Sequence, residues 1–365
     1  MKLSRKISLR LLSIICAGGI FSTASAYSDS IIYLGGDTTE YNGNTYKAGW
    51  WTKGDAPGTN HVWTLVSEST DTTPTPKPTP TPDTTDYNLH TDLQNIAPLA
   101  TFLKIFPHAD SVACTSKKDG MHGVYAGLIE AAKEFPEFAN PDALPDMIGG
   151  FTLTEQDKVS IAKREVAAFL ANASQETTGG WATAPDGPSA WGLCFTEEVG
   201  CESGQCTEYT SKHDPATFPF STTETYHGRG MIQLSWNYNY KLFQDYYNEN
   251  FANGNPIDLI NNPGLVIQDH KIAWLSALWF WMTPQSPKPS AHDAMTGIWQ
   301  PSDTDKNDGR LPGLVMTINI INGGLECSKP TIPKVEGRVS FMKRYSEILG
   351  TTTGDNLYCN NMKHY

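Results

Sequence analysis

The chain has 365 residues, of which 39% are hydrophobic, and after the first 26 no stretch is long and apolar enough to span a bilayer. It carries 27 basic against 39 acidic residues, a formal net charge of −12. This balance argues against nucleic acid or an anionic membrane surface as the partner, whereas a neutral polymer is compatible with it.

Residues 1–26 have the composition of a secretory signal peptide. Four basic residues precede an apolar run from Leu11 to Phe21, and Ala24-Ser25-Ala26 matches an A-x-A cleavage sequence. An uncleaved membrane anchor is the alternative, but the clean cleavage sequence favours removal. We therefore predict a secreted, extracellular protein, with the periplasm as the open alternative. Since four basic residues and no acidic one leave with the signal peptide, the mature chain would carry 23 basic and 39 acidic residues, a net charge of −16.

Residues 27–66 are rich in tyrosine and tryptophan, and short β-type runs alternate with glycine and asparagine turns. We predict a small antiparallel β module. Trp50 and Trp51 are adjacent, so on a strand they would point to opposite sides, and at most one of them can be well buried in a single sheet. The other is a candidate for stacking on a flat sugar ring. For Tyr33, Tyr41 and Trp63 we favour burial in the core.

Residues 67–86 alternate threonine with proline and predict an extended linker that separates the small module from a large unit, residues 87–365. In the large unit, helical spacing of apolar residues predicts helices over the ranges Tyr125–Phe135, Ile161–Ala173 and Val335–Leu349, and a nearly continuous apolar run predicts a buried helix over His270–Met282. No alternation of strands and helices is visible. We therefore expect a predominantly α-helical, two-lobed fold instead of a βα barrel.

Six cysteines remain after signal cleavage: Cys114, Cys194, Cys201, Cys206, Cys327 and Cys359. An even count in an oxidising compartment implies up to three disulfides, with fifteen possible connectivities. Zinc binding is the competing interpretation. It is disfavoured because only Cys201 and Cys206 lie close together, no C-x-x-C occurs and no histidine pair has ligand spacing. We expect no metal and no cofactor.

Two glutamates are candidates for acid–base chemistry. Glu176 follows the helix predicted over Ile161–Ala173 and precedes two threonines and two glycines, and Glu198 ends the segment W-G-L-C-F-T-E-E. Two carboxyl groups in different environments can break a glycosidic bond, one by protonating the leaving oxygen and the other by activating water. A glutamate at a helix end is more often an ordinary surface residue, so the pair alone does not establish this chemistry.

Longer motifs around the glutamates resemble a known family. They read S-Q-E-T-T-G-G-W-A-T-A-P-D-G-P-S-A-W-G-L-C-F-T-E-E (174–198), Y-H-G-R-G-M-I-Q-L-S-W-N-Y-N-Y (226–240), F-W-M-T-P-Q-S-P-K-P-S (280–290) and I-N-I-I-N-G-G-L-E-C (318–327). In this order, from about Phe102 to the C-terminus, they resemble glycoside hydrolase family 19, the chitinases typified by plant class I and II enzymes. The run Y-N-G-N-T-Y-K-A-G-W-W-T-K-G-D-A-P-G (41–58) resembles carbohydrate-binding modules of families 5 and 12.

The family resemblance implies a lysozyme-like endochitinase that hydrolyses β-1,4 bonds between N-acetylglucosamine units with inversion. It implies that Glu176 is the general acid, Glu198 the general base and Ser235 a residue that helps to hold the water. For inversion, the carboxyl groups should lie roughly 6.5–9.5 Å apart, or slightly more. The positions that match the sugar-binding cleft are Gln233, Tyr238, Asn239, Gln285, Lys288 and Asn322.

The resemblance also implies supporting residues. Glu326 and Arg338 match a charged network beside the acid, although an ordinary buried ion pair remains an equal interpretation. The hydroxyl of Thr178 can bond a carboxylate. The implied disulfides are Cys114–Cys194, Cys201–Cys206 and Cys327–Cys359.

The sequence departs from the family pattern at Gln175, where histidine is usual. Glutamine keeps hydrogen-bonding groups but cannot carry a charge, so the pH optimum and the rate stay open. His227 is a tempting proton carrier, but we favour a structural role. The segments Thr207–Thr225 and Lys241–Ile257 are longer than usual in the family, which leaves the number of sugar subsites open.

Two other functions compete with a chitinase. A peptidoglycan-cleaving lysin of the same fold would act on a polymer that also contains N-acetylglucosamine, but the N-terminal module favours chitin. A chitin-binding protein without catalysis is disfavoured because both carboxylates and Ser235 are present. We expect a monomer whose partner is chitin, as insoluble polymer or oligomers, with neither nucleic acid nor, after signal cleavage, a membrane.

Overall fold

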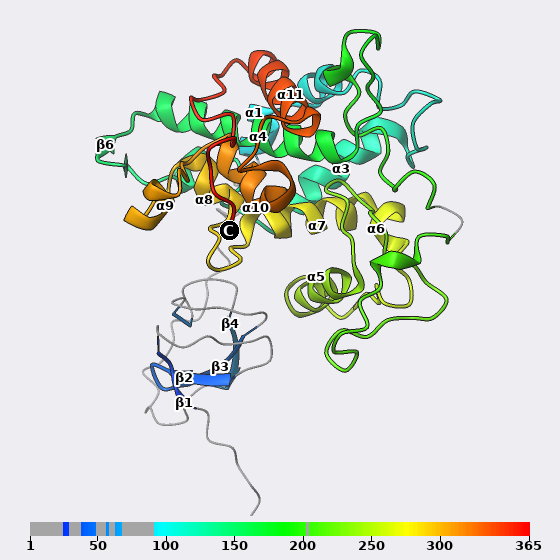
Figure 1. Ribbon diagram of the computed structural model, residues 1–365, viewed down its shortest axis with the longest axis vertical. Coiled ribbons are helices and arrows are strands. Elements are labelled where there is room, and N and C mark those ends of the chain that lie inside the picture. The colour runs from blue at the N-terminus through cyan, green and yellow to red at the C-terminus, as the bar shows by residue number, and fades with distance from the viewer. Residues whose placement is uncertain (1–24, 29–37, 49–55, 58–62, 68–90, 202–203) are drawn as a thin grey trace, which may run out of the picture.

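The structure is a computed structural model that describes residues 25–28, 38–48, 56–57, 63–67, 91–201 and 204–365. Tyr33, Trp50 and Trp51 lie outside these residues, as do most of the predicted signal peptide and almost all of the predicted linker. The described part divides into a small N-terminal sheet and a much larger helical unit (Figure 1). No helix in that part has the length and apolar character that crossing a bilayer demands.

The small unit is a four-stranded sheet in the order β1-β2-β3-β4. Its strands are β1 (Ser25–Ala26), β2 (Thr38–Tyr41), β3 (Asn44–Ala48) and β4 (Trp63–Ser67). The β2–β3 and β3–β4 pairs are antiparallel, as predicted, whereas β1 runs parallel to β2. Trp63 and its cross-strand partner Ala48 are both buried, which confirms the core role of Trp63. Tyr41 is half-buried and packs edge-on with Tyr27, at 5.4 Å between ring centroids.

The large unit is mostly helical. Its α-helices are α1 (Thr91–Ile96), α2 (Leu99–Ile105), α3 (Gly120–Ala132), α4 (Glu155–Glu176), α5 (Asn237–Asn250), α6 (Leu265–Gln268), α7 (His270–Met282), α8 (Ala291–Thr296), α9 (Asp303–Asn307), α10 (Leu314–Glu326) and α11 (Pro333–Leu349). Single 3-10 turns are η1 (Pro141–Ala143), η2 (Pro188–Ala190) and η3 (Thr207–Tyr209), and a short hairpin joins β5 (Met147–Ile148) to β6 (Phe151–Thr152). The four helices predicted from apolar spacing are all present, as α3, α4, α7 and α11.

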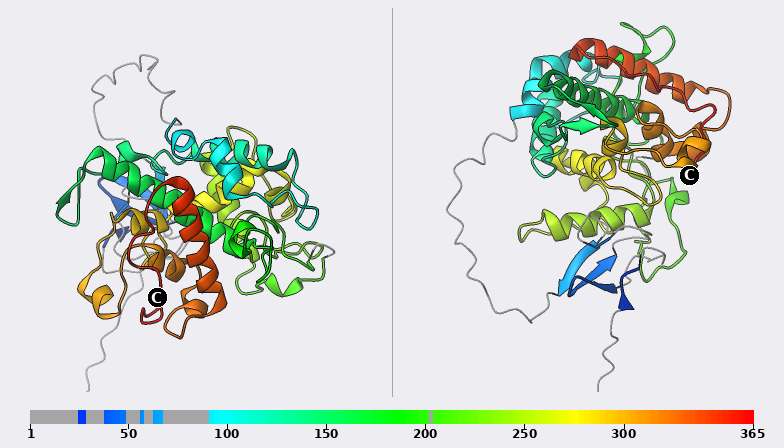
Figure 2. Two further views of the ribbon diagram at one scale, coloured as in Figure 1. Left: turned by 90° about the horizontal axis from the view of Figure 1, so that it is seen from above. Right: turned by 90° about the vertical axis from the view of Figure 1, so that its left-hand side faces the viewer.

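Helix α4 is the long central element. It begins at a capping box, in which the hydroxyl of Thr154 accepts from the backbone of Asp157 and the Asp157 carboxylate accepts from Thr154. The helix continues beyond the predicted end at Ala173, and Glu176 is its last residue. Helices α4 and α11 lie side by side in both figures, so the C-terminal end of α4 is flanked by α11 (Figures 1 and 2).

Helix α7 is buried on all sides, as its apolar sequence predicts. Trp274 and Trp281 are fully buried, and the Trp274 indole satisfies its N–H by donating to the carbonyl of Val124 in α3 at 2.9 Å. On its other side α7 packs against α5, where the rings of Trp279 and Phe243 are 5.6 Å apart. In Figure 2, α5 lies apart from the α4–α11 pair, with α7 between them. The helices therefore form two regions joined by α7.

Three disulfides hold the irregular segments. They are Cys114–Cys194, Cys201–Cys206 and Cys327–Cys359, the pairs that the family resemblance implies. All six cysteines after residue 26 are thereby oxidised, so none of these six is a thiolate ligand for zinc.

Candidate active site

The carboxylate of Glu176 lies at the C-terminal end of α4, where it meets the guanidinium of Arg338 from α11. Arg338 Nη2 donates to Glu176 Oε1 in a short hydrogen bond. The Arg338 side chain is fully buried, whereas that of Glu176 keeps 20% of its surface exposed. A ligand in solution can therefore reach Glu176 but not the cation that holds it.

Arg338 in α11 is bound by side chains from two other helices, α4 and α10. Its Nε and Nη2 donate to the two oxygens of Glu326 in α10 at 2.9 and 2.8 Å, and its Nη1 donates to Asn172 Oδ1 in α4 at 3.0 Å. Burial opposes the charge of the guanidinium, but the carboxylates of Glu176 and Glu326 outweigh it and raise the pKa of Arg338 further. Burial likewise opposes the charge of Glu326, yet Arg338 holds the pKa of Glu326 below its ordinary value. The pair is thus ionised, and Glu326 shares the positive charge that faces Glu176.

Asn322 belongs to the same network. Its Nδ2 donates to Glu326 Oε1 at 2.9 Å, and its own backbone leaves the helical region at φ −149°, so α10 is kinked at this residue. Nearby, Lys288 donates from Nζ to the carbonyl of Ile320 in α10 at 3.1 Å, and burial lowers the pKa of Lys288. Backbone hydrogen bonds in both directions join Lys288 to Gln285. These contacts bring two of the predicted cleft residues, Gln285 and Lys288, next to α10, the helix that carries a third, Asn322.

The turn after Glu176 is tightly packed. The Thr178 hydroxyl accepts from the backbone N–H of Gly180 at 3.0 Å, so in this structure it caps the turn instead of contacting the carboxylate. Side chains cannot be accommodated at Gly179, because a Cβ there would collide with the Cys194 sulfur of the Cys114–Cys194 disulfide. At Gly180 a Cβ would collide with the carbonyl oxygen of Pro188, so each of the two glycines is required by its own close approach.

Glu198 is held differently from Glu176. Its Oε1 accepts from the hydroxyl of Tyr209 at 2.7 Å, and its Oε2 accepts from the backbone N–H of Gly228 at 3.0 Å. Its own backbone N–H donates to the Gly228 carbonyl at 2.9 Å. Both carboxylate oxygens of Glu198 are thus held by neutral donors.

A buried charged cluster lies behind Glu198. His227 Nε2 lies 3.0 Å from Glu197 Oε1, and its Nδ1 is 2.9 Å from the hydroxyl of Thr225. Arg229 approaches the same Glu197 oxygen at 3.4 Å. Burial lowers the pKa of His227, although the hydrogen bond to Glu197 opposes this effect. The partners of His227 are therefore structural groups, which supports a structural role and not proton transfer to a ligand.

The remaining candidates follow in the segment that leads into α5. Ser235 donates to the carbonyl of Gln233 at 2.9 Å, and Asn239 donates to the carbonyl of Ser235 at 2.9 Å. Gln233 adopts a positive φ of 56° and donates from Nε2 to the Gly230 carbonyl at 3.1 Å. Tyr238 packs on Trp236 at 5.8 Å between ring centroids, and burial raises its pKa. The side chain of Ser235 thus engages its own loop here, whereas Tyr209 and Gly228 hold Glu198.

Sequence reasoning missed two residues of these networks, Tyr209 and Asn172. Asn172 precedes Glu176 by one helical turn, and its spacing is a signal that could have been read. Tyr209 lies in a long irregular segment without periodicity, and no local pattern points to it.

Comparisons with known proteins agree on one family. The sequence model described as chitinase class I, glycoside hydrolase family 19, matches residues 98–359, and that of carbohydrate-binding module family 5/12 matches residues 26–64. A basic endochitinase of Vitis vinifera is 42% identical over 274 residues, which cover 75% of this chain and 77% of the relative. Endochitinase A2 of Pisum sativum is 46% identical over 259 residues, 71% of this chain and 70% of the relative.

Two solved structures are also similar. Chitinase C from Streptomyces griseus HUT6037 matches at 31% identity and a TM-score of 0.50, and the match covers 92% of this chain and 100% of that one. A class IV chitinase from Zea mays matches at 25% identity and a TM-score of 0.50, covering 73% of this chain and 100% of that one. With the helical architecture described above, these matches confirm the predicted fold class, a two-lobed, lysozyme-like helical unit beside a small β module.

Proposed function

The chain belongs to glycoside hydrolase family 19, the class I chitinases, and on this basis we propose that it is a secreted endochitinase that hydrolyses the β-1,4 bonds of chitin with inversion. One observation carries the proposal: two partly exposed glutamates are held in unlike surroundings. Glu176 faces a buried arginine that it shares with Glu326, whereas Glu198 meets only the neutral donors Tyr209 and Gly228 among the contacts described.

The two environments fit two different roles. Glu198, whose two oxygens are held by neutral hydrogen-bond donors, is oriented to take a proton from water. Glu176 is fixed in direction by Arg338, whose charge Glu326 also partly neutralises, and its partly exposed side chain is assigned the delivery of a proton to the glycosidic oxygen. Ser235 would help Glu198 to hold the water, once its hydroxyl turns from the Gln233 carbonyl towards a bound ligand.

Substrate recognition would use the amides and aromatic rings around these glutamates. The N-acetyl and hydroxyl groups of chitin need both hydrogen-bond donors and acceptors, which amide side chains supply. We assign this role to Gln233, Tyr238, Asn239, Gln285, Lys288 and Asn322.

Single substitutions test the assignment. Glu176→Gln and Glu198→Gln should each lower kcat on chitin hexamer by about 10²–10⁴-fold, while binding to insoluble chitin persists. Anomers of the first products, followed by NMR, should be α when a β-linked substrate is cleaved. Near-normal activity of either variant, or β products, would refute the mechanism. Turbidity loss of bacterial walls without chitin hydrolysis would instead identify a lysin.

The organisation of the chain is part of the proposal. Residues 1–26 would be removed, 27–66 would bind chitin, 67–86 would link, and 87–365 would hydrolyse the polymer. Cleavage after Ala26 would remove β1 and leave three antiparallel strands. The intact mass of protein from the culture medium should correspond to a chain that begins at Tyr27, and light scattering should give a monomer.

Retention on insoluble chitin can show which of Trp50 and Trp51 contacts the polymer. Either Trp50→Ala or Trp51→Ala, but not both, should abolish retention on insoluble chitin while activity on soluble oligomers persists. Equal retention by both variants would remove these residues from the binding surface.

A further inference from the structure

The hydroxyl of Tyr209 is one of the two donors that hold the carboxylate of Glu198. It lies 2.7 Å from Glu198 Oε1, and the N–H of Gly228 lies 3.0 Å from Oε2. Two donors on two different oxygens fix the plane of a carboxylate, whereas one donor would leave it free to rotate. We propose that Tyr209 is a positioning residue for the general base Glu198, an inference that rests on the proposed function.

The position of Tyr209 is itself fixed by α5. Asn237, the first residue of α5, is fully buried, and its Oδ1 accepts from the backbone N–H of Ser211 at 2.8 Å. Its Nδ2 donates to the carbonyls of Ser211 at 3.1 Å and Phe218 at 3.0 Å. One buried amide therefore fastens the irregular segment just after Tyr209 at two points.

The ring of Tyr209 is also supported. It meets the ring of Trp236 edge-on, with 5.6 Å between centroids and an interplanar angle of 78°. Trp236 adjoins Ser235, the residue expected to help hold the water. The Cys201–Cys206 disulfide closes the chain between Glu198 and Tyr209. The segment that carries Tyr209 is thus restrained before this residue by the disulfide and after it by the hydrogen bonds of Asn237.

A phenol suits this position chemically. It donates one hydrogen bond without adding a positive charge, so Glu198 is oriented without being neutralised. The hydrogen bond to Glu198, with burial as a second cause, raises the pKa of Tyr209 to about 12, so the phenol stays protonated and remains a donor at neutral pH. A donor to a carboxylate favours its charged form.

The test is the pH profile of kcat/KM on soluble chitin hexamer for Tyr209→Phe, which keeps the ring and removes the hydroxyl. The acidic limb reports the free base, and it should move up by about 0.5–1 pH unit because Glu198 loses a donor. At neutral pH, kcat should fall about tenfold from loss of orientation, with KM within about twofold.

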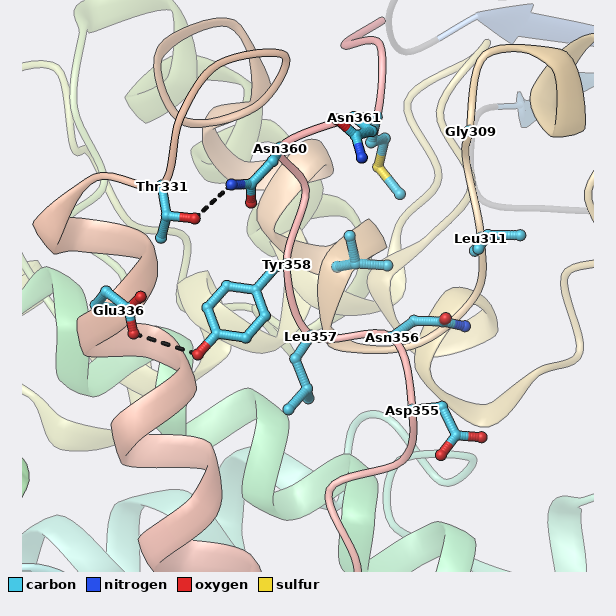
Figure 3. Close-up of a pocket in the computed structure, with 12 residues that line it drawn as sticks. Gly309, Leu311, Thr331, Glu336, Asp355, Asn356, Leu357, Tyr358, Asn360 and Asn361 are labelled. Atoms are coloured by element: carbon cyan, nitrogen blue, oxygen red, sulfur yellow. Dashed lines mark hydrogen bonds between the residues drawn. The ribbon is translucent and has the colours of Figure 1, made fainter.

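Tyr358→Phe is the matched control. Tyr358 also donates its hydroxyl to a carboxylate, at 3.3 Å from Glu336 Oε2, in a pocket at the C-terminal segment (Figure 3). Glu336 and Arg338 are two residues apart on α11 and therefore point to opposite sides of the helix, the first exposed and the second buried. This variant should leave both limbs of the profile and kcat unchanged.

The outcomes separate the inference from the proposed function. If Glu198→Gln is inactive but the acidic limb of Tyr209→Phe does not move, the role of Tyr209 is overturned and the assignment of the base stands. An active Glu198→Gln overturns the assignment of the base, whatever Tyr209→Phe does. A fall in activity with an unmoved limb, or an equal shift in Tyr358→Phe, would show a general structural effect and also refute the inference.

Discussion

The side chain of Gln175 lies directly against the backbone of Gly337, so that a methyl group on that glycine would overlap the amide oxygen of Gln175. Gln175 precedes Glu176, and Gly337 precedes Arg338. The contact between α4 and α11 at this point therefore adjoins the hydrogen bond between Arg338 and Glu176. The residue that departs from the family pattern thus faces the neighbouring helix, and its side chain lies against the backbone of the residue that precedes the arginine.

Gly337→Ala should therefore disturb both stability and activity. The added methyl group must displace the Gln175 amide, which is the far end of a flexible side chain, so the free energy of unfolding should fall by no more than about 1 kcal/mol. We expect Tm to fall by no more than roughly 2–4 °C in calorimetry, whereas the rate of chitin hydrolysis should fall clearly, because the displaced amide adjoins Glu176 and Arg338.

The control for this prediction is Gly324→Ala. Gly324 is an exposed glycine in α10, and a Cβ there would meet no atom within 4 Å. Its substitution should change the free energy of unfolding by no more than about 0.5 kcal/mol. Equal rates of chitin hydrolysis in the two variants would contradict the argument that this contact positions Arg338.

Arg338→Lys should be far more damaging than a change of one basic residue for another suggests. A lysine has no planar fork, so it cannot serve Glu326, Asn172 and Glu176 together. Breaking a buried pair leaves a carboxylate without a partner and costs about 3–5 kcal/mol. Denaturant unfolding should show this loss, and hydrolysis should fall below detection.

An exposed ion pair provides the comparison. Lys133 lies 2.6 Å from Glu130 on the surface of α3, and both side chains are largely solvated. Lys133→Gln should cost less than about 1 kcal/mol and leave hydrolysis unchanged. If Arg338→Lys proved equally mild, the buried network would not be what orients Glu176.

The elements that could be predicted best from the sequence are helices with a continuous or periodic pattern of apolar residues. The apolar run His270–Met282 is α7 with the same bounds, because burial on all sides leaves an unbroken hydrophobic signal. The end of α4 was predicted three residues early, because Glu176 is held by Arg338 from α11, a partner 162 residues away. Tyr209 escaped prediction for a similar reason, since its contact with Glu198 crosses an irregular segment that has no period.

Two buried histidines should give folding stability a pH dependence of opposite sign. His292 Nδ1 lies 2.6 Å from Glu165 Oε1, in a buried site where Glu165 also accepts from Trp281. Burial opposes the charge of His292, but Glu165, aided by the more remote Asp293 and Glu137, raises its pKa above 6.5. Its contribution to stability is therefore fully present below pH 6.5 and is lost as the pH rises through the folded-state pKa.

His227 behaves in the opposite way. Burial is the main cause that lowers its pKa below 6.5, although Glu197 opposes the shift. Its contribution is present above pH 6.5 and is lost as the pH falls through the folded-state pKa. Calorimetry from pH 5 to 9, about two units either side of a free histidine, should separate the two groups. We expect His292→Gln to remove part of the fall in Tm at alkaline pH, and His227→Gln to remove part of the fall at acidic pH. Each unit of difference between the folded-state and unfolded-state pKa corresponds to about 1.4 kcal/mol in the free energy of unfolding. An alkaline loss that persists in full in His292→Gln would show that the Glu165 pair does not control it.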